Sequence, residues 1–301
     1  MGPTLARMTA RAATALADGR RVYAASRFSS DAAERALAGA GVHTVRCDLL
    51  DRDAVARLPD APNVVFMAGQ KFGTSDAPAT TWAMNTVVPA ICAERYRSSR
   101  IVAFSTGNVY PLTAVDSGGS RETDVPAPVG EYAISALGRE RVLEFHSARY
   151  GTRVAIVRLN YAIDLRYGVL ADIAQRVRRG DAVPLAMGYV NVIWQGDANR
   201  MAIECLPHAA TPPFVLNVTG AQTLAVRDIA ERFGERLQRA PRFTGGERPD
   251  ALLSNTERLR SLFAPAETSL DEMIEWTASW IDGGGAMLDK PTHFEERSGR
   301  F

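Results

Sequence analysis

The stretch NVVFMAG, residues 63–69, is apolar at every position from Val64 to Ala68. A strand with one wet face alternates polar and apolar residues, so this unbroken run predicts a strand buried on both faces of a parallel sheet. The spacing then predicts a long helix over Pro78–Ser98 and a second apolar strand, RIVAFSTG, over Arg100–Gly107. Strand, helix and strand in this order predict a right-handed parallel crossover.

The same alternation continues on both sides of this unit. It predicts an α/β fold, a doubly wound parallel sheet with helices on both faces. The further predicted elements are helices over Pro3–Leu16, Asp31–Ala38 and Tyr132–Tyr150, and strands over Val22–Ala25, His43–Cys47 and Thr152–Asn160.

Beyond about residue 160 the alternation loosens, which predicts a smaller mixed lobe. Its predicted helices span Leu170–Arg178, Asp197–Leu206, Val226–Leu237 and Leu270–Ile281. We therefore expect a main domain over 1–160 and a lobe over 161–282 with some segments returning to the main domain. Residues 283–301 are expected to form an extended tail that packs on the body or on a second subunit.

The composition argues against several classes of function. The 301 residues carry a formal net charge of +1, which gives no attraction for nucleic acid or an acidic membrane surface. The sequence has no apolar run of about 18 residues and no secretory block at its start, so we predict a cytoplasmic protein. The three cysteines form no CxxC pair and the four histidines no ligand spacing, so we predict no metal site.

Ligands of a doubly wound sheet bind at the carboxyl ends of its strands. FSTGNVY (104–110) closes one predicted strand, and EYAISALGRERV (131–142) opens a long helix with a tyrosine. Together with CDLLD (47–51) and MNTVVPA (84–90), these motifs follow the order of the extended short-chain dehydrogenase/reductases. The chain resembles the NAD-dependent epimerase/dehydratase family over about residues 1–282. The resemblance implies a Rossmann-like dinucleotide-binding domain followed by a substrate lobe.

Catalysis in this family rests on a Ser or Thr, a Tyr, and a Lys four residues after the Tyr. The resemblance implies that Tyr132 is the acid/base and that Thr106, with Ser105 beside it, is the hydroxyl partner. Position 136 is alanine, so the lysine that lowers the pKa of the phenol is missing. A tyrosine with a pKa near the usual value of about 10 is a poor base at neutral pH.

Two basic residues are candidates to replace that lysine. Arg139 lies two helical turns after Tyr132, about 10 Å by helix rise, which is too far unless its side chain folds back. Lys71 follows the strand whose loop covers the cofactor in this family, and Lys290 is the only other lysine. We predict that Lys71 supplies the positive charge near Tyr132; the alternative is a solvated loop lysine.

The start of the chain departs from the family pattern. There the first strand ends in G-x-x-G-x-x-G, and Gly2 resembles the third glycine. We therefore expect that this sequence begins at an internal methionine, without the first strand of the family's order 3-2-1-4-5-6. Two neighbouring strands would then lack their shared partner. The alternative is that Gly2 and Pro3 are an ordinary helix start that binds no ligand.

The resemblance also implies a set of cofactor-binding residues. Ser26 and Arg27 follow the strand whose end selects the cofactor; they favour NADP over NAD, and the alternative is a surface arginine. Asp48 matches an aspartate that binds the adenine amine, or it caps a helix. Ala68 and Gly69 end the next strand. Asn85 matches an asparagine that steadies the active-site backbone, or it bonds a nearby carbonyl.

Asn160, Tyr161 and Arg166 are the expected substrate-side residues, although the family's Tyr-Gly-Pro triplet is absent. We expect an NAD(P)-dependent epimerase, dehydratase or dehydrogenase for a nucleotide sugar or sugar acid. The alternatives are a non-catalytic NAD(P)-binding sensor or scaffold, and a defective product of a wrongly set start codon. By family analogy we expect a homodimer formed through the helices Pro78–Ser98 and Tyr132–Tyr150.

Overall fold

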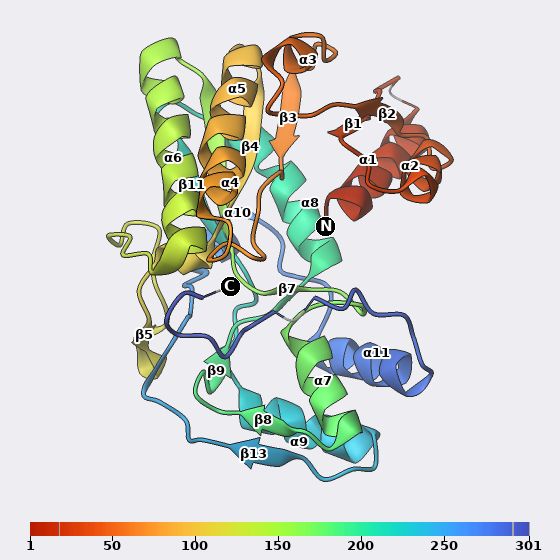
Figure 1. Cartoon of the computed structure of the whole chain (residues 1–301), viewed down its shortest axis with the longest axis vertical. Helices are drawn as coiled ribbons and strands as arrows, with labels where there is room; N and C mark the ends of the chain where they lie inside the picture. The colour runs from red at the N-terminus through yellow and green to blue at the C-terminus, as the bar shows by residue number, and fades with distance from the viewer. Residues whose placement is uncertain (18, 291, 301) are drawn as a thin grey trace.

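The centre of the molecule is a four-stranded parallel sheet (Figure 1). The computed structural model describes residues 1–17, 19–290 and 292–300. The strand order is β11–β6–β4–β3, formed by Phe214–Val218, Arg153–Leu159, Arg100–Thr106 and Asn63–Phe66. β4 and β6 pair along their whole length, from Arg100 opposite Arg153 to Thr106 opposite Leu159. The predicted parallel α/β sheet is confirmed.

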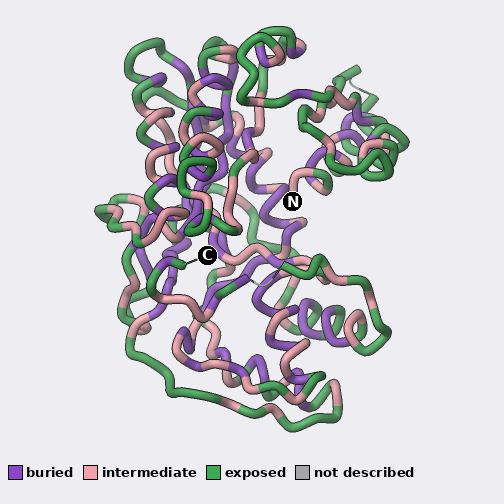
Figure 2. Tube along the Cα trace, viewed as in Figure 1, coloured by how far each residue is buried: buried purple, intermediate pink, exposed green. Residues whose placement is uncertain are grey.

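Helices cover both faces of this sheet. One face packs through Val102 and Val157 against α8 (Gln195–Glu204) and the start of α1 (Gly2–Leu16). The other face packs through Ile101 and Ile156 against α5 (Val88–Arg95) and α6 (Gly130–Tyr150). Figure 2 shows the central strands as the most deeply buried part of the trace.

The predicted helix over Pro78–Ser98 contains a wider turn. α4 (Pro78–Trp82) leads into a π-helical turn, η1 (Ala83–Val87), before α5 begins. Pro89 has no N–H, so it cannot donate to the carbonyl of Asn85 four residues earlier. The sequence analysis did not predict this π turn.

A second unit is formed by β1 (Tyr23–Ser26) and β2 (His43–Arg46), which pair in parallel. With α1 and α2 (Asp31–Ala38) they enclose a small apolar cluster. In the part of the chain that the structure describes, no ladder joins β1 to β3. The two strands predicted to lack a shared neighbour are therefore both edge strands.

The C-terminal lobe is built on three helices, α7 (Val169–Arg179), α9 (Val226–Arg236) and α11 (Leu270–Asp282). Their apolar faces meet in one core around Ile173 and Phe233. α8 and β11 lie between α7 and α9 in the sequence but pack on the main sheet. The domain boundary at residue 160 stays a prediction.

The remaining elements are short, and most were not predicted because two or three residues carry no period. No helix of the described ranges is long and apolar enough to cross a membrane. The elements are α3 (Arg52–Ala56), α10 (Glu257–Leu262), η2 (Gly107–Val109), η3 (Val115–Ser117), η4 (Leu206–His208), β5 (Thr113–Ala114), β7 (Ala162–Ile163), β8 (Ala182–Pro184), β9 (Tyr189–Val190), β10 (Ile193–Trp194), β12 (Leu224–Ala225), β13 (Arg242–Thr244) and β14 (Asp250–Ala251).

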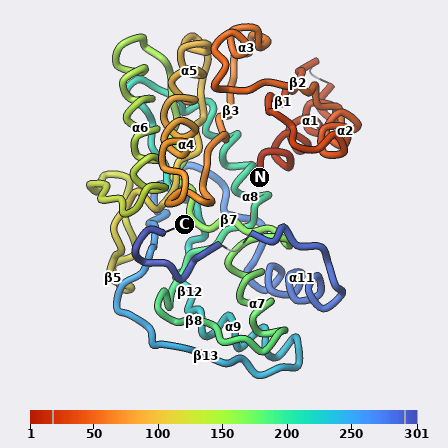
Figure 3. Tube along the Cα trace, viewed as in Figure 1, coloured from red at the N-terminus to blue at the C-terminus, as the bar shows by residue number. Residues whose placement is uncertain are grey.

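The tail after α11 packs on the body of the same chain (Figure 3). Phe294 is 1% exposed and joins the core of the lobe. Thr292 donates to the Asp172 carboxylate of α7 from its backbone N–H (2.8 Å) and its hydroxyl (2.5 Å). Further along, a Cβ added to Gly130 would lie 2.0 Å from the carbonyl oxygen of Gly299. The tail therefore reaches the start of α6.

Candidate active site

Tyr132 and Thr106 meet at the carboxyl end of the central sheet. Thr106 is the last residue of β4, and Tyr132 lies in the first turn of α6. The Thr106 hydroxyl interacts with the Tyr132 phenol and acts to lower the pKa of that phenol. Thr106 Oγ1 also accepts from the backbone N–H of Asn108 at 3.2 Å, which fixes the orientation of its side chain. The structure thus brings together the two hydroxyl groups that the sequence predicted to act together.

The charge that acts on Tyr132 is that of Arg139. Burial raises the pKa of the Tyr132 phenol, while the Thr106 hydroxyl and the Arg139 charge act in the opposite direction. The Arg139 side chain does fold back, since its guanidinium donates to the carbonyl of Phe104 at 2.5 Å and to Asn85 Oδ1 at 2.9 Å. Both Arg139 and Lys71 were candidates from the sequence to replace the missing lysine, and Lys71 was the predicted one.

Lys71 is paired with a different tyrosine. Its Nζ donates to the Tyr167 hydroxyl at 3.1 Å and lies over the ring of Phe72. Burial lowers the pKa of Lys71 to about 8, against the charge of Asp172. The phenol of Tyr167 interacts electrostatically with Tyr132 in turn. Lys71 is therefore half-buried and paired with Tyr167, and its role as the positive charge near Tyr132 stays a prediction.

Ser105 belongs to a buried network beneath the Tyr132–Thr106 pair. Its hydroxyl donates to Glu140, which forms an ion pair with Arg158 at 2.7 Å; the two charged side chains are 1% and 5% exposed. Arg158 also donates to the Tyr110 hydroxyl at 2.7 Å. Each charge has a partner, so the network stabilises the junction of β4, α6 and β6. A catalytic role for Ser105 stays a prediction.

Asn85 uses its whole side-chain amide within the protein. Oδ1 accepts from the N–H of Gln70 (2.8 Å) and from Arg139 (2.9 Å), and Nδ2 donates to the Gln70 carbonyl and to Ser135 Oγ, both at 2.9 Å. The loop after β3 is thereby fixed to α6. A direct bond from Asn85 to a cofactor would have to replace one of these contacts.

The small residues expected near the cofactor lie at two places, after β3 and at the start of α1. Ala68 and Gly69 follow β3, and the exposed Gly69 lies on the Arg139 guanidinium, since a Cβ there would be 2.3 Å from Nη2. Gly2 opens α1 with no side-chain cap and open space around its Cα. An uncapped helix N-terminus and a bare backbone suit a pyrophosphate and a ribose, so these residues fit a dinucleotide.

The residues expected to select the cofactor lie on the surface. Ser26 and Arg27 are exposed at the end of β1, and the Arg27 guanidinium makes no ion pair within the described residues. Asp48 is exposed after β2, and its Oδ1 accepts from the N–H of Leu50 at 3.0 Å. Asp48 thus closes a turn with one carboxylate oxygen.

The three expected substrate residues differ in their settings. Asn160 is 2% exposed and donates to the carbonyl of Leu252 at 3.2 Å. Tyr161 has a φ of 40°, which is uncommon for a residue with a side chain, and burial raises the pKa of its phenol. Arg166 is paired with Asp164 at 2.9 Å and keeps 43% of its side chain exposed. Arg166 is thus the most accessible of the three.

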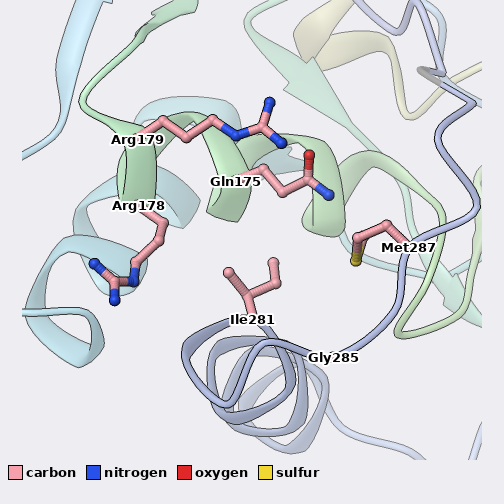
Figure 4. A pocket seen from close by; sticks show the side chains of 6 residues that line it. All are labelled: Gln175, Arg178, Arg179, Ile281, Gly285 and Met287. Carbon is pink, nitrogen blue, oxygen red and sulfur yellow. The ribbon is translucent and has the colours of Figure 1, made fainter.

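The hollow in Figure 4 is a different place. It lies between α7 and the end of α11, holds about 190 Å³, and none of the predicted site residues lines it. Small-molecule sites usually exceed about 300 Å³. Within the described ranges, no group of three or more His, Cys, Asp or Glu side chains is arranged to hold a metal ion. Neither feature alters the assignment of the site to Tyr132.

Sequence reasoning missed Tyr167 and Glu140. Tyr167 lies far from Lys71 in the sequence, and nothing in its neighbours marks it as a partner. Glu140 had a signal: it falls on the same helix as Tyr132, and the buried strand that follows this helix carries Arg158, which neutralises it. An acid and an arginine on adjacent buried elements are a pair that can be sought in advance.

Comparisons with known proteins agree with this geometry. Residues 9–185 match the sequence profile of the NAD dependent epimerase/dehydratase family. No curated protein matches the sequence. The profile covers the sheet strands β3, β4 and β6 together with Thr106, Tyr132 and Arg139.

Three solved structures of similar shape are sugar-nucleotide epimerases or dehydratases. The UDP-glucose 4-epimerase of Thermotoga maritima, with UDP-glucose, has a TM-score of 0.76 and 18% identity over 93% of this chain and 96% of its own. The Thermus thermophilus UDP-glucose 4-epimerase, with NAD, has a TM-score of 0.73 and 21% identity over 92% and 96%. A dTDP-glucose 4,6-dehydratase double mutant from Streptomyces venezuelae, with NAD, has 0.75 and 18% over 92% of each chain. At these identities the likeness shows the fold.

Proposed function

Because the chain belongs to the NAD-dependent epimerase/dehydratase family, we propose that it oxidises, reduces or epimerises a carbinol carbon of a nucleotide sugar or sugar acid with NAD(P). The observation that carries the proposal is the pairing of the Tyr132 phenol, in the first turn of α6, with the Thr106 hydroxyl at the end of β4. The nicotinamide supplies a hydride acceptor or donor. In the oxidative direction the Tyr132 phenolate would take the proton of the substrate hydroxyl, the hydride on the same carbon would pass to the oxidised nicotinamide, and Thr106 would orient the substrate oxygen.

The binding residues are part of the same proposal. Gly2 and Gly69, with Ala68, would hold the pyrophosphate and ribose, and Asn85 would act through the loop that it fixes. Arg27 and Ser26 would contact the adenosine ribose and favour NADP, with Asp48 at the adenine. Arg166, with Asn160 and Tyr161, would lie on the substrate side. A cytoplasmic homodimer remains the expected state.

Coenzyme binding followed by turnover tests this function. NADH and NADPH are titrated against the chain by their fluorescence, and UDP-glucose is then supplied with the oxidised coenzyme while reduced nicotinamide or 4-epimer is monitored. We expect a saturable signal with at least one coenzyme and a product with a nucleotide sugar. A chain that binds neither coenzyme would contradict the proposal.

A second candidate function is a non-catalytic NAD(P) sensor, and Ala136 favours it. Ala136 is 2% exposed and packs against Val109 and Tyr110, so a lysine at this position would overfill a packed site. Ala136→Lys is for this reason a poor way to restore catalysis. Coenzyme binding without turnover of UDP-glucose or UDP-glucuronate would favour the sensor.

A further inference from the structure

Arg139 is a buried cation with no carboxylate partner among the residues that the structure describes. Its side chain is 7% exposed, and its donors go to neutral oxygens, the Phe104 carbonyl and the Asn85 side chain and carbonyl. Its neighbour Glu140 is committed to Arg158. A buried charge without a directly bonded counter-charge costs free energy of folding, and the two groups whose negative charge would stabilise Arg139 are the Glu140 carboxylate and the ionised Tyr132 phenol.

Contacts with several parts of the fold hold the Arg139 guanidinium in place. Pro89 leaves the Asn85 carbonyl without its usual helical donor, and Arg139 Nε donates to that oxygen at 3.4 Å. Asn85 Oδ1 accepts from Nη2, and the ring of Phe66 lies 5.6 Å from the guanidinium carbon. Gly69 leaves the space that Nη2 occupies. Four elements of the fold therefore hold Arg139 in one position.

Arg139 lies seven residues after Tyr132 on α6, and its charge acts on the Tyr132 phenol. Residues seven apart on a helix share one face, and a long side chain leans toward the N-terminus of its helix, where Tyr132 lies. Among the residues that the structure describes, Thr106, Arg139 and Tyr167 interact with the Tyr132 phenol, and Lys71 pairs with Tyr167. Among these three side chains, Arg139 is the charged one.

We propose that Arg139 replaces the lysine that is absent from position 136. Its positive charge stabilises the phenolate form of Tyr132. Arg139 is a positioning residue, since it acts through Tyr132. The catalytic meaning of this inference rests on the proposed function, but the coupling of the two side chains is a property of the chain alone.

Titration of the Tyr132 phenol tests the coupling without substrate or cofactor. Tyrosines labelled with ¹³C at Cζ are followed by NMR from about pH 7 to about pH 11, and Tyr132→Phe identifies the signal. The variants are Arg139→Gln, which keeps an N–H donor but no charge, and Arg139→Lys, which restores the charge. Arg141→Gln is the matched control, because Arg141 lies on the same helix, exposed, and pairs with Glu144.

We expect Arg139→Gln to reduce the phenolate fraction of Tyr132 at a given pH by about tenfold, a rise of about one unit in its pKa. Arg139→Lys should recover most of it, and Arg141→Gln should leave it unchanged. A wild-type titration in folded Arg139→Gln would overturn the inference.

A second variant covers the case in which Arg139→Gln does not fold. Gly69→Ala keeps the charge but displaces Nη2, so it should reduce the phenolate fraction in the same direction, and an unchanged titration would count against the inference. NADH titration of the wild-type chain separates the two proposals. Absent coenzyme binding contradicts the proposed function, while the phenol titration still decides the role of Arg139.

Discussion

Two pairs of strands in the first 160 residues, β4 with β6 and β1 with β2, form two groups that differ in burial (Figure 2). β4 and β6 are buried at almost every position, whereas β1 and β2 hold no buried residue. Thr106, Tyr132 and Arg139 depend on the first group; Arg27 and Asp48 lie on the second. The residues proposed for catalysis are thus held by closely packed strands. The residues proposed for cofactor choice lie on exposed strands, where substitutions are better tolerated.

The largest expected effect is on turnover. Tyr132→Phe should lower NAD(P)-dependent conversion of a nucleotide sugar by about 10²- to 10⁴-fold, because it removes the proton-transferring group. Coenzyme affinity, measured by NADH fluorescence, should stay within about twofold. Tyr150→Phe, an exposed tyrosine at the other end of α6, is the control. Equal turnover in Tyr132→Phe would exclude this tyrosine as the acid/base.

The second-largest expected effect is on the free energy of unfolding, which should differ between variants of the β4–β6 group and variants of the β1–β2 group. Glu140→Ala leaves Arg158 buried without its partner, so urea unfolding should show a loss of about 3–5 kcal/mol. Glu34→Ala breaks the pair with Arg46 in the β1–β2 unit, where Arg46 is half exposed, and should cost much less than Glu140→Ala. Similar losses in both variants would remove the contrast between the groups.

A smaller effect of pH is expected from Lys71, on the loop after β3. Its pKa is about 8 when folded and 10.5 ordinarily, so between these values the unfolded chain binds more protons. The free energy of unfolding should therefore rise with pH in this window, relative to Lys71→Met. Urea unfolding of both proteins at about pH 7.5 and about pH 9.5 measures it. Lys290→Met should follow the wild-type chain; parallel curves for Lys71→Met would contradict the shift.

The smallest effect is expected on the exposed group. Arg27→Ala should weaken NADPH binding about tenfold, or about 1.4 kcal/mol, and leave NADH binding unchanged. Because Arg27 is exposed, the free energy of unfolding should change by less than about 0.5 kcal/mol. Arg35→Ala, exposed on α2, is the control for lost surface charge. Equal weakening of both coenzymes would assign Arg27 no part in the choice.

Much of the fold was predictable from periodicity, because long amphipathic helices and apolar strands carry clear patterns. The helix over Asp31–Ala38 was predicted with its observed bounds. The π turn was not, since it depends on how Pro89 and Asn85 fit against α6. Short strands of two or three residues follow from tertiary packing, which no local pattern encodes.

The site was predictable only in part. The order of motifs identified Tyr132 and Thr106, which meet in the structure. The reach of Arg139 depends on its side-chain conformation and on the space at Gly69, neither of which helix geometry alone supplies. The partner of Lys71 is set by a loop and a strand end far apart in sequence.

Gly130 and Gly299 bring the tail against the helix that carries Tyr132. Both have positive φ values, 83° and 76°, and a Cβ on Gly299 would lie 2.2 Å from the Val129 carbonyl oxygen. Ser298, next to this contact, is exposed. A fluorophore or spin label attached there would report directly whether coenzyme or sugar nucleotide displaces the tail, without any need for turnover.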